Sequence, residues 1–184
     1  LPMAIAMVFV AARAMAAGGI TQNDALLLAA QLFSLGGDVF LMLPGNYFIP
    51  GLASFLVAHL CYLGALLRLR GRSGPRLAGA AVVVAAVVGM LLWFWPRLLD
   101  QGLVIPVTVY MAVLGAMVCA ALLARLPTPW TAMGAVCFAV SDGMIGTGQF
   151  VLQSHALEVP IWWVYAASQV LITAGFFFGR RTGD

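Results

Sequence analysis

Charged residues are scarce in this sequence, and lysine is missing from it altogether. Of its 184 residues, 8% are charged and 64% are hydrophobic, whereas a soluble domain has about 25% charged and roughly 45–50% apolar residues. These proportions exclude a soluble globular protein and indicate an integral membrane protein. The nine cations are all arginines, and they lie beside apolar segments, so we expect no nucleic-acid partner.

Cysteine is also rare, and the motifs of several enzyme classes are absent. Cys61, Cys119 and Cys137 lie inside apolar runs at spacings that match no metal site, so we expect small core residues without a disulfide. The sequence contains no Gly-x-Ser-x-Gly elbow, no His-Glu-x-x-His pair and no phosphate-binding loop. These templates therefore do not apply, and we expect neither a metal nor another cofactor.

Seven apolar segments are long enough to cross a membrane as helices, which takes about 20 residues within a range near 17–25. Glycine and proline clusters separate them and supply the turns. No other stretch is long enough for a soluble domain, so we expect residues 1–184 to form one all-α transmembrane bundle. The chain starts without Met, which we interpret as truncation. The expected helices are 1–17, 24–43, 50–68, 76–95, 103–124, 129–149 and 159–178.

The arginines predict how this bundle is oriented. Alternation of the seven spans places eight arginines on one side and leaves Arg97 on the other. Because cytoplasmic loops are enriched in Arg and Lys, we expect that side, and the C-terminus with it, to be cytoplasmic in a bacterial inner (plasma) membrane. The eight are Arg13, Arg68, Arg70, Arg72, Arg76, Arg125, Arg180 and Arg181. Four tryptophans fall near the predicted outer interface: Trp93, Trp95, Trp162 and Trp163.

Two aspartates, Asp38 and Asp142, stand inside the apolar segments. An ionisable group within a membrane is costly unless it is paired or faces water, so it indicates a functional site. On the predicted topology both lie roughly 8–10 Å below the outer ends of their helices, and His59 lies about 13 Å deep, at 1.5 Å per residue. The three side chains can therefore meet in one cavity that opens toward the outer leaflet.

Further polar residues follow helical spacing, and polar stripes in membrane helices point inward. Interhelical hydrogen bonding is the alternative explanation for each stripe, and a structural role is the alternative for the histidine. The groups that share a helix face are Gln31, Ser34 and Asp38; His59 and Tyr62; and Tyr165, Gln169 and Thr173.

The buried carboxylates fit more than one function. Two carboxyl groups in one apolar site can divide into a protonated acid and an ionised base, as in glycoside hydrolysis. They are equally normal in a small proton-coupled transporter, and the Gly36-Gly37 pair in one half and Gly143, Gly146 and Gly148 in the other are compatible with its broken helices. A lipid-binding protein without chemistry is a third alternative. Composition and spacing leave the enzyme and the transporter nearly equal.

Four segments carry a family resemblance: 33–42 (FSLGGDVFLM), 58–62 (AHLCY), 134–142 (GAVCFAVSD) and 165–169 (YAASQ). In this order they closely resemble the YhhN family of membrane lysoplasmalogenases. The resemblance implies eight helices, the first of which is absent here. It also implies hydrolysis of the vinyl-ether bond of lysoplasmalogens, which gives a fatty aldehyde and a glycerophospho-ethanolamine or -choline. The implied partners are a lysophospholipid substrate and the membrane lipid.

The implied chemistry suits the two aspartates. An acid protonates the alkene carbon of a vinyl ether and leaves an oxocarbenium ion, which water attacks. One of Asp38 and Asp142 would be the acid, and the other would stabilise the cation and deprotonate the water. We favour Asp142 as the acid because it lies deeper in its helix. Candidates to orient water or bind the substrate are Ser34, Asn46, His59, Tyr62, Tyr110, Ser141, Tyr165 and Gln169.

Overall fold

The computed structural model describes residues 11–12, 19–69, 74–154 and 156–178. The six helices of this part of the chain are all long and apolar enough to cross a membrane, which confirms the all-α membrane class. The predicted count of seven is not matched, because the segment 1–17 lies outside the described residues except for 11–12. The helices are α2 (Gln22–Met42), α3 (Phe48–Leu67), α4 (Gly74–Asp100), α5 (Val104–Leu123), α6 (Trp130–Thr147) and α7 (Glu158–Phe178), with a π-helix η1 (Gly148–Leu152) after α6.

The helix boundaries match the predicted ones closely except at the end of α4. Helix α2 starts two residues early because Thr21 and Asp24 form a capping box, in which each side chain accepts a hydrogen bond from the other residue's backbone N–H. Helix α4 was expected to end before Pro96, but it continues through that proline to Asp100. A proline inside a helix costs roughly 3 kcal/mol. Leu98, in the turn that follows the proline, is fully buried, so this turn packs against the rest of the bundle.

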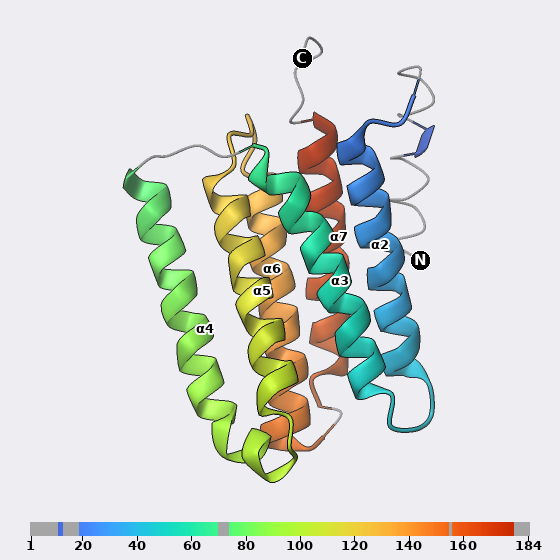
Figure 1. The fold of residues 1–184 in the computed structure, drawn as a ribbon, viewed down its shortest axis with the longest axis vertical. Coiled ribbons are helices and arrows are strands. Elements are labelled where there is room, and N and C mark those ends of the chain that lie inside the picture. The colour runs from blue at the N-terminus through green and yellow to red at the C-terminus, as the bar shows by residue number, and fades with distance from the viewer. Residues whose placement is uncertain (1–10, 13–18, 70–73, 155, 179–184) are drawn as a thin grey trace.

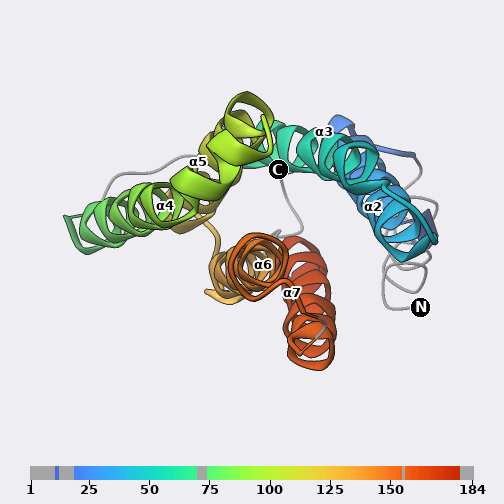
Figure 2. The same cartoon turned by 90° about the horizontal axis from the view of Figure 1, so that it is seen from below.

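The helices form an arc with a hairpin inside it. Figure 2 shows α4, α5, α3 and α2 in succession along the arc, with α6 and α7 on its concave side. Among the described residues the backbones of α7 and of α2 or α3 make no contact, and long side chains bridge the space instead. Gln31 donates to Thr173 at 2.8 Å, and Tyr62 donates to Gln169 at 2.8 Å. The interior of the bundle is therefore filled by polar and aromatic side chains.

The glycines within α2 and α6 do not break these helices. Helix α2 runs continuously through Gly36 and Gly37, and α6 runs through Gly143 and Gly146. A Cβ atom on Gly37 would lie 2.5 Å from the ring of Phe55, which no real contact allows. The absence of a side chain thus lets α2 and α3 pack closely. The broken helices that a transporter would use are not observed at these four positions. At the fifth glycine, Gly148, α6 gives way to the π-helix η1.

The six helices alternate in direction, so the bundle has two distinct ends (Figure 1). We call the end where α2 joins α3 and α6 joins α7 the lower end, and the opposite end the upper end. Tryptophan side chains gather near membrane interfaces, and four exposed ones lie near the lower end, on α4 and α7. They are Trp93, Trp95, Trp162 and Trp163.

The described arginines are distributed as the alternation of spans requires. Arg68 and Arg76, beside the ends of α3 and α4, and Arg125, after α5, lie at the upper end, and Arg97 lies at the lower end. The Arg76 side chain donates to the carbonyl of Ala124 at 2.9 Å and so ties the start of α4 to the end of α5. The other arginines of the predicted cytoplasmic side lie outside the described residues: Arg13, Arg70, Arg72, Arg180 and Arg181.

Candidate active site

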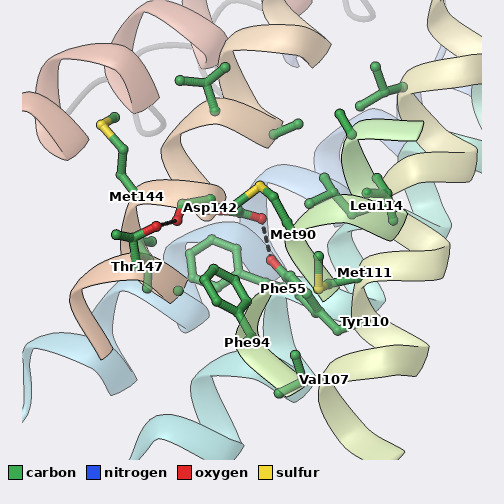
Figure 3. Close-up of a pocket in the computed structure, with 18 of the residues that line it drawn as sticks. Phe55, Met90, Phe94, Val107, Tyr110, Met111, Leu114, Asp142, Met144 and Thr147 are labelled. Carbon is green, nitrogen blue, oxygen red and sulfur yellow. Dashed lines mark hydrogen bonds between the residues drawn. The ribbon is translucent and has the colours of Figure 1, made fainter. Parts of the chain in front are cut away.

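Helix α6 carries Asp142 into the interior of the bundle, where its side chain is 6% exposed. The hydroxyl of Tyr110, on α5, donates a hydrogen bond to Oδ2 of Asp142 (Figure 3). The Nε2 atom of His59, on α3, lies 3.7 Å from the same Oδ2. Three helices therefore converge on one carboxyl group, which has a hydroxyl donor and an imidazole beside it.

The ring of His59 is held by a hydrogen bond to its own helix. Its Nδ1 lies 2.5 Å from the carbonyl oxygen of Phe55, one turn earlier. A carbonyl only accepts, so Nδ1 carries a proton and donates it in this bond, while Nε2 faces Asp142. Nε2 is buried and has no hydrogen-bond partner among the described residues. Both an imidazole nitrogen and a carboxyl oxygen can donate or accept a proton, so this pair is suited to acid–base chemistry.

The second carboxylate, Asp38 on α2, pairs with a residue of α7. Its side chain lies beside the hydroxyl of Tyr165 and interacts with it. Asp38 and Asp142 also interact electrostatically, and Tyr165 interacts with both. The two carboxylates thus belong to one electrostatic cluster but approach it from different helices and have different tyrosine partners.

An aromatic cluster packs against both His59 and Tyr165. Its centre is the fully buried Phe138, whose ring centroid lies 4.7 Å from that of His59 and 5.4 Å from that of Tyr165. Phe55 packs edge-on against both Phe138 and Tyr165, at 6.2 and 6.1 Å. Neither phenylalanine was among the site residues predicted from the sequence. Their spacing could have indicated them, because each precedes His59 or Asp142 by four residues and so shares its helix face.

A cavity of about 490 Å³ lies beside Asp142, between α3, α4, α5 and α6. Its wall is apolar except for Asp142, Tyr110 and Thr147, and Figure 3 shows the carboxylate of Asp142 and the hydroxyl of Tyr110 facing one another within it. Neither Asp38 nor His59 is among its lining residues. The cavity therefore differs from the expected one, which all three residues would share.

Three of the five remaining candidates form a second polar layer. Tyr62 and Gln169 bind each other, and the buried Ser34 lies next to the Tyr62 hydroxyl. Ser141 is fully buried on α6. Asn46 is exposed in the loop between α2 and α3, and no contact found among the described residues brings it to the aspartates.

The clustered groups are suited to proton transfer. A carboxyl, an imidazole and two tyrosine hydroxyls can donate and accept protons, and a carboxylate in an apolar environment stabilises a nearby cation. Across the ranges that the structure describes, no group of three His, Cys, Asp or Glu residues is placed to hold a metal ion. The residues of this site can therefore perform acid–base chemistry on a molecule within the cavity.

Comparisons with known proteins connect this chain to one family. The model of the YhhN family matches residues 1–176. A lysoplasmalogenase of Mycobacterium tuberculosis is 54% identical over 183 residues, which cover 97% of this chain and 70% of the relative. The human lysoplasmalogenase TMEM86B is 33% identical over 156 residues, which cover 85% of this chain and 64% of the relative. No solved structure matches the chain.

Proposed function

This chain belongs to the YhhN family, and we propose that it is a lysoplasmalogenase, which hydrolyses the vinyl-ether bond of lysoplasmalogens. The products are a fatty aldehyde and a glycerophospho-ethanolamine or -choline. The observation that carries the proposal is the carboxyl of Asp142, which faces an apolar cavity inside a membrane bundle beside Tyr110 and His59. A lipid chain fits such a cavity, and its acid-labile bond would lie beside a proton donor.

In the proposed reaction Asp142 is the general acid. Its proton passes to the alkene carbon that is not bonded to oxygen, and the remaining carbon–oxygen unit becomes an oxocarbenium ion. Tyr110 donates its hydrogen bond to the carboxylate that forms, so this bond strengthens as the proton leaves. His59 faces the same oxygen and orients the acid. The step needs no group beyond those of the site, the substrate and water.

Asp38 is the proposed second carboxylate. Its negative charge favours the oxocarbenium ion through its electrostatic interaction with the Asp142 site. The carboxylate of Asp142, which lines the cavity, then accepts a proton from the water that attacks the cation, and this restores the acid. The hemiacetal then breaks into the aldehyde and the glycerophospho-alcohol, so one water is consumed. Tyr165, which contacts Asp38, holds this carboxylate in place.

The family assignment and the positions of the arginines support an orientation of the bundle in the membrane. Six apolar helices make this an integral membrane protein, and we propose that the upper end, with Arg68, Arg76 and Arg125, faces the cytoplasm of a bacterial cell. The candidate acid then lies nearer the outer leaflet. A lysolipid of that leaflet would reach it with its headgroup at the interface.

Aldehyde release from purified protein tests the proposal. The substrate is a 1-alkenyl lysolipid, and the matched 1-alkyl lysolipid, whose saturated ether offers no carbon to protonate, should not be cleaved. We expect Asp142→Asn to lower kcat by about 10²–10⁴-fold, the usual contribution of an acid–base group. Asp38→Asn should also lower kcat. Asp100→Asn, which changes an exposed carboxylate at the end of α4, should retain wild-type activity.

The outcomes separate the possible functions. Folded Asp142→Asn protein that releases aldehyde at the wild-type rate would refute the carboxylate mechanism. A wild-type protein that binds 1-alkenyl lysolipids but releases no aldehyde from any of them would refute the hydrolase. It would favour the carrier or lipid-binding alternative instead.

A further inference from the structure

The lining of the cavity changes along its length. Its polar groups, Asp142, Tyr110 and Thr147, lie in the part nearer the lower end. Toward the upper end its lining is purely aliphatic, with Leu114 and Val118 on α5 among the residues that form it. Tyr110 and Val118 are eight residues apart on one helix, so this aliphatic arm extends about 12 Å at 1.5 Å per residue. An amphiphilic molecule would place its apolar part in the arm.

The arm is open sideways, between α4 and α6. These helices meet where Gly143 lies against Met90 and where Gly146 lies against Phe94; a Cβ atom on either glycine would come within 2.9 Å of that neighbour. Nearer the upper end, three residues of these helices line the cavity and are also exposed at the surface: Val82, Val136 and Val140. The exposed fraction is greatest for Val82, at 67%. Figure 2 shows α4 at one end of the arc, apart from α6.

Helix α4 provides the outer wall of this opening. It is the most apolar of the described helices, with a mean hydropathy of 2.5, and the least buried. It packs mainly on α5, so its remaining surface faces lipid. A hydrocarbon chain can pass from the bilayer into the arm without crossing a polar surface.

We propose that the aliphatic arm holds the single hydrocarbon chain of the lysolipid, which enters sideways between α4 and α6 and runs from Asp142 toward the upper end. The inference rests on the proposed function, because it places the vinyl-ether bond beside Asp142. A cavity of about 490 Å³ accommodates one small ligand, so it takes one chain. In the leaflet at the lower end of the bundle, a hydrocarbon chain points toward the bilayer midplane. It keeps this direction in the arm, so the lipid does not have to reorient when it binds.

The position of the hydrocarbon chain determines how the length of that chain affects the reaction. Transfer of a chain from the bilayer to an apolar cavity gains little, because lipid is as apolar as the protein wall. Wild-type protein should therefore act on short and long chains with similar kcat/KM. A bulky side chain within the arm should instead exclude long chains by steric overlap and leave chains shorter than the remaining space unaffected.

Two neighbouring residues of α4 provide a matched test. Val83 lines the arm near its upper limit, whereas Val84 is exposed and does not line it. We expect Val83→Phe to lower kcat/KM at least tenfold for a long 1-alkenyl lysolipid and less than twofold for a short one. Val84→Phe should change neither. Activity on the short substrate shows that the variant is folded. Equal losses for both chain lengths, or equal effects of the two variants, would overturn the inference.

A binding measurement separates this inference from the proposed function. A non-cleavable 1-alkyl lysolipid with a photoreactive group at the chain end should cross-link to the upper part of the arm, around Val83 and Val118. Such labelling without aldehyde release from 1-alkenyl lysolipid would support the inference and refute the hydrolase. Aldehyde release with labelling confined to other helix faces would refute the inference and leave the hydrolase intact.

Discussion

Removal of the Tyr110 hydroxyl perturbs the proposed acid without touching the carboxyl itself. In Tyr110→Phe the ring remains and only the hydrogen bond to Asp142 is lost. A hydrogen bond to a charged group contributes about 1.5–3 kcal/mol. In the proposed step the charge on Asp142 appears as the proton leaves, so this energy is lost mainly in the transition state. At 1.36 kcal/mol for each tenfold change in rate, kcat should fall about 10–150-fold, with KM nearly unchanged.

The assay is the initial rate of aldehyde release over a range of lysoplasmalogen concentrations. Tyr62→Phe is the matched control, because it also removes a buried hydroxyl, which donates to Gln169 at 2.8 Å, but Tyr62 does not line the cavity. Its loss should cost about 0.6–2 kcal/mol of stability and leave kcat within about twofold of the wild-type value.

Three results would contradict this reasoning. The first is a Tyr110→Phe protein with wild-type kcat, and the second is a change confined to KM, which would indicate a role in binding alone. The third is an equal loss of kcat in the Tyr62→Phe control, which would indicate that any buried hydroxyl of the bundle matters through stability.

Two further predictions concern packing and orientation. Gly175→Ala should lower the stability by about 1–3 kcal/mol, because the added Cβ would lie 2.0 Å from Oγ1 of Thr131. Gly89→Ala is the control, because its Cβ would meet no atom within 4 Å. This variant should be neutral or more stable by up to about 1 kcal/mol. Thermal unfolding in detergent checks both, and equal melting temperatures would contradict the close packing of α6 and α7. In a cysteine-free background, a membrane-impermeant maleimide should label Asn46→Cys on intact cells and Pro127→Cys only after permeabilisation, and the reverse pattern would refute the orientation.

Much of the fold was predictable because its signals are local. Apolar length alone placed six helices within a few residues of their observed positions, and Thr21 and Asp24 explain the small difference at the start of α2. The end of α4 was missed because Pro96 is a local stop signal, whereas the burial of Leu98 in the following turn is a tertiary effect. Where apolar length and capping residues determine a helix, its position depends on that segment alone.

The candidate site was predictable in part. The cost of a carboxyl in a membrane singled out Asp38 and Asp142, and alternation of the spans put them at similar depth. The role of Phe138 was not foreseen, because a phenylalanine in an apolar helix is ordinary until its neighbours are known. In the structure its ring lies among those of His59, Tyr62 and Tyr165, which come from two other helices.

The sequence by itself determined the membrane class, the helix positions, the family and the two unusual carboxylates, because these depend on composition, segment length and local motifs. Only the tertiary structure decided that Asp142 lines the cavity, whereas Asp38 does not line it and lies beside Tyr165. Which side of a helix meets which neighbour depends on how closely the backbones approach. Residues far apart in the chain set that approach, as Gly37 does against Phe55.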